Sequence, residues 1–224
     1  MMKNRVLVFV DEANVTRAAS KGFNKSFDWV KFRDFLMNSG DAPRELVEMA
    51  VYIGLHPDPL KRQAQLRYVN FLQTLGFLVY TKEGQWIQCS DQRRGNGGRE
   101  GEAESQDRQA CGRQGAADSR DGKPSYKSNV DVIMAIDAMD LTNRIRPDVV
   151  IIVTGDSDFA HLASTIRREG IKVEVAAIPQ TLSSLLKKAA NRVIDLTDLI
   201  SSFDDYRSAE RPPALCFPQP AAGL

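Results

Sequence analysis

Residues 148–159 read DVVIIVTGDSDF, and this stretch indicates the fold of the chain. After Asp148 the run to Val153 is continuously apolar, which is typical of a parallel strand that is buried on both faces. Residues 154–158 then form a turn that carries two aspartates, and residues 159–168 have helical spacing up to Gly170. The stretch therefore predicts a strand, a turn and a helix, which is the repeating unit of an α/β sheet.

The same unit recurs on both sides of this stretch. Apolar runs predict strands at residues 6–10, 46–53, 77–80 and 173–177, and a short edge strand at residues 193–196. Helical spacing predicts helices at residues 28–38, 59–75, 129–143 and 182–190, whereas residues 12–27 are expected to form an extended polar loop. About five strands that alternate with helices predict a three-layer α/β fold, in which helices cover both faces of a central, mostly parallel sheet.

Residues 90–122 interrupt this pattern, because they contain no Val, Ile, Leu, Met or aromatic residue. Such a segment cannot bury enough apolar surface to offset its loss of conformational entropy on folding. We therefore expect one domain over residues 1–203, with a disordered or mobile insertion at residues 89–126, and an unstructured tail at residues 204–224. The insertion can be a plain solvated loop or an arm that contacts phosphate groups, and its nearly balanced charge favours the loop.

Composition narrows the class of protein. The chain has 224 residues, of which 42% are hydrophobic and 26% charged, and this balance fits a globular α/β domain. A net charge of +1 means that any surface for a nucleic acid must be local. The sequence has no long apolar run, and its amino terminus passes directly into the first strand. We therefore expect no membrane association and a cytoplasmic location.

Cysteine and histidine are too few to build a metal site by themselves. Cys89, Cys111 and Cys216 are widely spaced and fit neither a disulfide framework nor a zinc site. His56 and His161 are the only histidines in the sequence. If the chain binds a metal, carboxylates must supply most of the ligands, and this favours a hard ion.

Four aspartates follow predicted strands or begin a predicted helix. Asp11 comes directly after the first strand, and Asp156 and Asp158 come directly after the strand that ends at residue 153. Asp131 lies in the first turn of the helix predicted at residues 129–143. Functional groups of open α/β sheets gather beyond the carboxyl ends of the strands. If the two strands are neighbours, the four carboxylates face one crevice.

A cluster of ionised aspartates repels itself unless a divalent cation neutralises it. Mg²⁺ and Mn²⁺ prefer carboxylate and water ligands, and an ion of this kind activates water for hydrolysis of a phosphodiester. Taken singly, Asp131 and Asp158 can be helix N-caps, and Asp11 can be a turn residue. Asp137 lies on a different helix face and is expected to be a structural partner, and His161 is expected to pack. The convergence of four acids is what indicates a metal site.

Specific motifs carry a resemblance to a known family. VFVDEAN at residues 8–14 is similar to an opening strand with an Asp-x-x-Asn motif, and residues 130–138 are similar to a helix with Val-Asp followed by Asp-Ala. TGDSDF at residues 154–159 is the most specific match, and residues 185–196 provide a further one. Over residues 5–200 the chain resembles the NYN domains of the PIN-like nuclease superfamily, particularly the bacterial LabA-like branch.

The resemblance implies a Rossmann-like PIN fold, a Mg²⁺ or Mn²⁺ cofactor, and a ribonuclease that acts on RNA or single-stranded nucleic acid. The resemblance assigns a double role, as metal ligand and as catalytic group, to four residues: Asp11, Asp131, Asp156 and Asp158. Supporting roles fall to Asn14, Thr154 and Ser157. The cations that could neutralise substrate phosphates are Arg17, Lys21 and Lys127, although solvated surface charge explains each of them as well. PIN-like domains often self-associate, so a homo-oligomer is also expected.

The chain departs from the family pattern at three places. Glu12 stands where the family often has glycine, and it adds charge near the site. Ser128 and Asn129 stand where a Lys-Gly pair usually precedes Val-Asp, so a phosphate contact at that loop is in doubt. Asn191 stands where an acidic residue is common, and it is expected to be structural.

Three hypotheses follow from these observations. The first is a metal-dependent ribonuclease, in which Asp156→Asn abolishes cleavage. The second is an RNA-binding regulatory module with a vestigial site, which binds RNA in a salt-sensitive way but does not cut it. The third is another phosphotransfer enzyme, such as a Toprim-like or haloacid-type phosphatase domain. Toprim domains have Glu after the first strand and these phosphatases have Asp-x-Asp, so DEAN at residues 11–14 fits neither.

Overall fold

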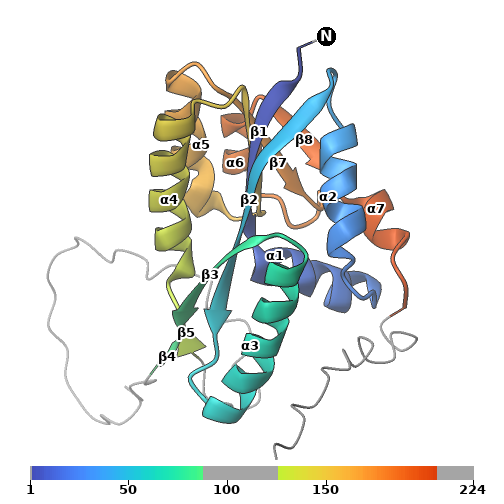
Figure 1. Ribbon diagram of the computed structural model, residues 1–224, viewed down its shortest axis with the longest axis vertical. Coiled ribbons are helices and arrows are strands. Elements are labelled where there is room, and N and C mark those ends of the chain that lie inside the picture. Colours follow the sequence, from blue (N-terminus) through green and yellow to red (C-terminus); the bar gives the residue numbers. More distant parts are fainter. Residues whose placement is uncertain (1, 88–125, 206–224) are drawn as a thin grey trace, which may run out of the picture.

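The computed structural model describes residues 2–87 and 126–205, which form a three-layer α/β structure (Figure 1). The described residues contain a six-stranded sheet in the order β3-β2-β1-β6-β7-β8, and every neighbouring pair is parallel. The strands are β1 (Asn4–Asp11), β2 (Arg44–Leu55), β3 (Leu78–Glu83), β6 (Val149–Val153), β7 (Lys172–Ala177) and β8 (Arg192–Asp195). The predicted α/β fold is confirmed, with the predicted edge strand as β8.

Helices cover both faces of this sheet. One face carries α1 (Glu12–Arg17), the π-helical turn η1 (Ala18–Gly22), α2 (Trp29–Asn38), α3 (Pro59–Thr74) and α7 (Thr197–Ser201). The other face carries α4 (Val130–Ile145), α5 (Ala160–Arg168) and α6 (Ser184–Ala189). In Figure 1, α4 and α5 lie to the left of the sheet and α2 and α7 to its right. The continuous apolar strands are therefore buried on both sides.

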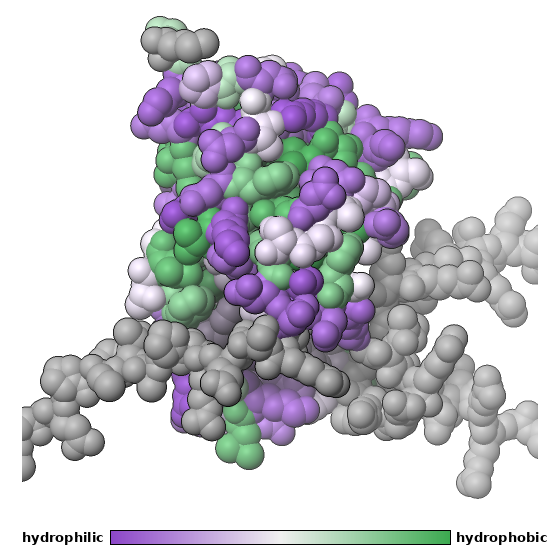
Figure 2. All heavy atoms as spheres, turned by 90° about the vertical axis from the view of Figure 1, so that its right-hand side faces the viewer, coloured by the Kyte–Doolittle hydropathy of each residue, from purple (hydrophilic) through white to green (hydrophobic). Residues whose placement is uncertain are grey.

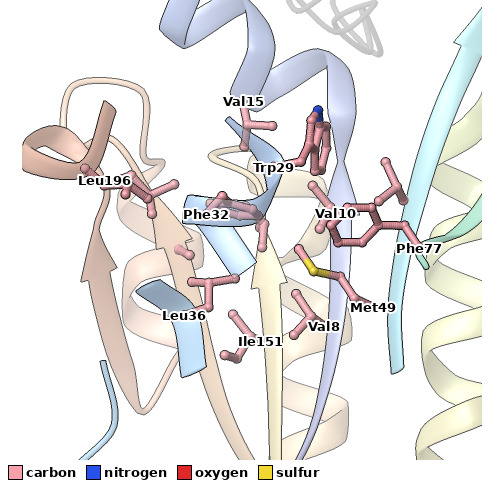
Figure 3. Packing of buried hydrophobic residues seen from close by; sticks show 14 of the residues in the cluster. Val8, Val10, Val15, Trp29, Phe32, Leu36, Met49, Phe77, Ile151 and Leu196 are labelled. Atoms are coloured by element: carbon pink, nitrogen blue, oxygen red, sulfur yellow. The ribbon is translucent and has the colours of Figure 1, made fainter. Parts of the chain in front are cut away.

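The side chains of β1 alternate between two hydrophobic cores. Val8 and Val10 point into the core under α2, and Leu7 and Phe9 point into the core under α4. Figure 3 shows the first core, where Phe32 of α2 packs over the valines. Phe32 is fully buried, which contributes about 1.5–3 kcal/mol relative to an exposed side chain.

Helix α2 has one apolar and one polar side. Trp29, Phe32 and Leu36 are buried, whereas Lys31 and Asp34 are exposed. This spacing places the apolar residues on one stripe of the helix. On the side of the molecule where α2 and α7 lie, hydrophilic side chains separate the hydrophobic ones into small patches (Figure 2).

Residues 12–22 are helical, so the prediction of an extended loop at residues 12–27 was wrong. The Asp11 carboxylate accepts a hydrogen bond from the backbone N–H of Asn14 and caps α1. Val15 and Ala19, four residues apart, are both buried against the sheet. Two buried residues are too few to give a clear helical period, but they are enough to hold a short helix that is already capped.

The fold contains a short antiparallel ribbon that was not predicted. Strand β4 (Gln85–Trp86) pairs with β5 (Tyr126–Lys127), on either side of the predicted insertion. That insertion, residues 89–126, lies outside the described residues except for Tyr126, which belongs to β5. At the start of the predicted tail, the Ser26 N–H donates to the Asp204 carbonyl and Lys25 pairs with Asp205 at 3.0 Å. The rest of the tail lies outside the described residues.

A buried ion pair closes the end of the sheet where β2 and β7 begin. Arg44 lies 2.7 Å from the carboxylate of Glu174, and both side chains are at most 2% exposed. Arg44 also donates to the Leu36 carbonyl and so fixes the end of α2. Lys172 and Arg192 lie 3.3 and 3.9 Å from Glu174. These cations offset the charge of the buried carboxylate, although its Oε1 accepts no hydrogen bond.

The strand order reverses between β1 and β6. From β1 the chain proceeds outward to β2 and β3, and from β6 it proceeds the other way to β7 and β8. Ligands of open α/β sheets bind beyond the carboxyl ends of the strands at such a switch point. Within the described residues, no helix is both long and apolar enough to cross a membrane.

Candidate active site

Asp11 and Thr154 stand side by side at the switch point. Val10 of β1 is in register with Val153 of β6, so the residues that follow them are neighbours. The Thr154 hydroxyl donates to Oδ2 of Asp11 at 3.2 Å, and the N–H of Asn14 donates to Oδ1 at 3.2 Å. Thr154 is completely buried. One oxygen of the Asp11 carboxylate therefore accepts a hydrogen bond from helix α1, and the other accepts one from the loop after β6.

Helix α1 and the loop after β6 are also joined directly. The side-chain carbonyl of Asn14 accepts a hydrogen bond from the Gly155 N–H at 3.2 Å, and the Thr154 hydroxyl accepts one from the Asp156 N–H at 3.3 Å. A Cβ atom on Gly155 would collide with the backbone carbonyl of Thr181. The loop after β6 can take this path only with glycine at position 155.

Asp156 is held by the turn that it begins. Its Oδ1 accepts hydrogen bonds from the Asp158 N–H at 3.0 Å and from the Ser157 hydroxyl at 3.5 Å. Both bonds go to the same oxygen of Asp156. Asp158 itself is exposed. The sequence offered Asp158 as a possible helix N-cap, but Asp156 caps the short helix at Ser157–Phe159 instead. This cap orients the Asp156 carboxylate at the edge of the sheet.

Asp131 completes the group from the other helical layer. Asp131 lies in the first turn of α4. Burial is the main cause that raises the pKa of Asp131, and the carboxylates of Asp156 and Asp158 raise it further, whereas Lys127 lowers it. Burial and then Asp131 raise the pKa of Asp11 from its ordinary value of 3.8 to about 6. The hydrogen bonds to Asp11 only partly offset this. Asp131 thus lies within electrostatic range of each of the other three predicted acids.

The donor chemistry of this group fits a hard divalent cation. Burial, and after it the neighbouring carboxylates, raise the pKa of Asp11 and of Asp131, and a bound cation would oppose both effects. Carboxylate oxygens are the ligands that Mg²⁺ and Mn²⁺ prefer. Within residues 2–87 and 126–205, no three His, Cys, Asp or Glu side chains already have the arrangement of a metal site.

The predicted substrate cations lie on three different elements. Arg17 is exposed at the end of α1 and lowers the pKa of Asp11, and Lys127 is exposed in β5 and lowers that of Asp131. Lys21 is exposed in η1. Arg17 therefore acts electrostatically on Asp11 from α1, and Lys127 acts on Asp131 from the ribbon of β4 and β5.

Three residues were expected to stand outside the site. Asp137 accepts a hydrogen bond from the Tyr52 hydroxyl at 3.2 Å, which is a structural role. Asn191 accepts one from the Val173 N–H at 2.9 Å and holds the start of β7. His161 is exposed on α5, so the packing role expected for it is wrong.

Glu12 is a further acid at the site whose burial the sequence did not reveal. Burial raises the pKa of Glu12, with a contribution from Asp11 that Arg17 opposes. The Glu12 charge also helps to raise the pKa of Tyr68 on α3. The only sequence signal for the burial of Glu12 was its position next to Asp11. That signal was missed because residues 12–27 were predicted to be a loop, whereas Glu12 begins α1.

Comparison with known proteins identifies the family and agrees with the fold. The NYN domain family matches residues 5–198 of the chain. Among solved structures, the chain is similar to VPA0982, a protein of unknown function from Vibrio parahaemolyticus RIMD 2210633. The two are 24% identical with a TM-score of 0.56, over 87% of this chain and 93% of that chain, and this likeness shows the fold. A search of curated proteins found no match. The chain therefore belongs to the NYN domain family, within the PIN-like nuclease superfamily.

Proposed function

We propose that this chain is a metal-dependent ribonuclease that hydrolyses RNA phosphodiester bonds. NYN domains are generally nucleases, so a nucleic acid is the expected substrate. The observation that carries the proposal is that Asp131, in the first turn of α4, lies within electrostatic range of Asp11 at the end of β1 and of Asp156 and Asp158 after β6. Asp11, Asp131, Asp156 and Asp158 are assigned as the metal-binding and catalytic acids.

The chemistry divides between the ion and the chain. A bound Mg²⁺ or Mn²⁺ ion would supply a water of lowered pKa and would offset charge on the phosphate. The chain supplies orientation, because Thr154 and Asn14 hold both oxygens of Asp11 and the turn holds Asp156. Such preorganisation lowers the cost of assembling charged groups at the reacting centre.

The exposed cations are assigned to the substrate. Arg17 and Lys127 lie where they act on the acids, and they can neutralise phosphates on either side of the cleaved bond. Lys21 lies one helical turn beyond Arg17 and extends the same surface. Ser157 supports the site through its hydrogen bond to Asp156.

The experiment is an RNA cleavage assay with single-stranded and structured substrates. Each substrate is incubated with EDTA, Mg²⁺ or Mn²⁺, together with wild-type protein, Asp11→Asn or Asp156→Asn. Cleavage is expected only with a divalent ion and is expected to be lost in both variants. Asp140→Asn is the matched control, because Asp140 is also on α4 but is paired with Arg144 at 2.8 Å.

Two outcomes oppose the proposal. Cleavage that persists equally in both site variants identifies a contaminating nuclease. Salt-sensitive RNA binding without cleavage under any metal condition favours the regulatory binding module instead. The homo-oligomer and the cytoplasmic location expected from the sequence stay predictions.

A further inference from the structure

Three aromatic rings gather at the ribbon formed by β4 and β5. The His56 ring lies 4.6 Å from Tyr126 and 5.3 Å from Trp86, and Trp86 lies 6.2 Å from Tyr126, measured between ring centroids. Trp86 meets the His56 and Tyr126 rings edge towards face, at 83° and 78°, and the His56 and Tyr126 rings are tilted by 56° to each other. Trp86 is 47% exposed, although a large aromatic side chain stabilises a fold most when it is fully buried. Part of a fixed aromatic surface therefore faces outward.

This aromatic group is anchored to the end of β2. The Gly84 N–H donates to the Leu55 carbonyl at 2.8 Å, and the Tyr126 ring lies against Gly84, where a Cβ atom would collide with it. Ser128, which follows β5, packs against Gly54 of β2. Figure 1 shows the ribbon at the end of β3, below α4. The rings are therefore held by the sheet itself.

The aromatic group lies at the same edge of the sheet as the acids. Tyr52 of β2 is in register with Asp11, and Leu55 is three residues further, which is about 10 Å along the strand. Tyr126 precedes Asp131 by five residues, so their Cα atoms are at most about 18 Å apart. A chain of a few nucleotides can span this distance.

The charge around the rings suits a polyanion. Lys61 of α3, Lys82 of β3 and Lys127 of β5 are all exposed. Of the neighbouring acids, Glu83 pairs with Arg62 and Asp58 caps the start of α3. The ring of His56 accepts a hydrogen bond from the Asp58 N–H at its Nδ1, and burial lowers the pKa of His56. The imidazole is therefore a neutral aromatic surface at pH 7, and the lysines supply the positive charge.

We infer that His56, Trp86 and Tyr126 form a platform on which unpaired bases of single-stranded RNA stack, so that the strand leads towards the four acids. This inference rests on the proposed function and names its substrate class. Aromatic side chains that stack on successive bases, beside cations that follow the backbone, are the usual means of binding single strands. In a duplex the bases are paired and stacked on one another, and the platform cannot reach their faces.

The test measures binding separately from cleavage. Asp156→Asn protein in EDTA is titrated with fluorescein-labelled single-stranded RNA, single-stranded DNA and duplex RNA of one sequence, and anisotropy is recorded. Adding Trp86→Ala should weaken binding of both single strands at least about fivefold, and Trp86→Phe should restore most of it. Phe71→Ala is the matched control, since Phe71 is an aromatic residue of α3 with 41% exposure.

The outcomes separate the platform from the nuclease. Equal losses for single-stranded RNA and DNA support stacking on bases, which the two share. Unchanged single-strand affinity in Trp86→Ala, or equal binding of the duplex, overturns the platform even if the wild-type protein cleaves RNA. Absence of cleavage in the wild type overturns the proposed function but leaves the binding result intact. Circular dichroism of each variant shows whether it is folded.

Discussion

Replacing Asp11 by Asn should stabilise the metal-free protein at neutral pH while it abolishes cleavage. The folded structure raises the pKa of Asp11 from 3.8 to about 6, because burial and Asp131 oppose its ionisation. A tenfold change in an ionisation equilibrium corresponds to about 1.4 kcal/mol, so ionised Asp11 destabilises the fold by about 3 kcal/mol at pH 7.5. An asparagine at position 11 can still accept the hydrogen bond from the Asn14 N–H. It loses the hydrogen bond from the Thr154 hydroxyl, which costs about 1 kcal/mol. The expected net gain is about 2 kcal/mol.

The sign of the pH dependence follows from the direction of the shift. Because the pKa of Asp11 is raised in the folded state, its favourable contribution is complete below pH 3.8 and is lost as the pH rises through about 6. The advantage of Asp11→Asn should therefore be largest above pH 6 and should shrink towards pH 4. A divalent ion should reverse the order, because only the wild-type protein gains stability by binding it.

Denaturation followed by circular dichroism measures these differences. Wild-type protein, Asp11→Asn and the control Asp140→Asn are unfolded at pH 5.0 and 7.5 in EDTA, and again with Mn²⁺. At pH 7.5 in EDTA, Asp11→Asn should melt about 4–8 °C above the wild type, whereas the control should match it. If Asp11→Asn is the less stable protein at pH 7.5 without metal, burial and Asp131 do not oppose the ionisation of Asp11 in the fold, and the electrostatic reasoning fails.

Three further substitutions test the supports of the site and the sheet. Thr154→Val removes the hydroxyl that joins Asp11 to the Asp156 N–H, and should cost about 1–3 kcal/mol in urea unfolding and slow cleavage; unchanged activity would mean that Asp11 needs no such support. Gly155→Ala places a methyl group against the carbonyl of Thr181 and should destabilise the fold by about 1–3 kcal/mol, so a neutral result would refute the close approach. Arg44→Met leaves Glu174 buried with one less cation and should lower the free energy of unfolding by about 3–5 kcal/mol. The double variant Arg44→Met, Glu174→Leu should recover most of this stability. An equal loss in the single and the double variant would show that the two charges are not coupled.

The layers of the fold were predictable because the strands are buried on both faces. Runs such as residues 149–153 are apolar without alternation, which is typical of a strand inside a covered sheet, and their short length favours a strand over a helix. Helix α1 was missed because it buries only Val15, and η1, which follows it, buries only Ala19. The ribbon of β4 and β5 has two residues in each strand, and its existence depends on contacts between segments that are 40 residues apart along the chain. Local patterns carry no record of such contacts.

The sequence indicated which acids lie at the sheet edge, but it did not indicate which residues hold them in place. Asp11, Asp131, Asp156 and Asp158 were chosen because they follow strands or begin a helix, and the fold places these positions at one edge. The bond between Thr154 and Asp11 depends on the register of β1 with β6, which no single segment encodes. The burial of Glu12 depends on α1 and on the approach of Tyr68 from α3, so it appears only when the chain is folded.

The central claim is that these four carboxylates share a divalent cation. Crystals of the wild-type protein soaked in MnCl₂ and measured near the manganese absorption edge test it directly. The account predicts an anomalous peak within bonding distance of Asp11 and Asp156, and its loss in Asp156→Asn crystals. A wild-type protein that cleaves RNA while its manganese peak lies elsewhere, or is absent, would contradict the account.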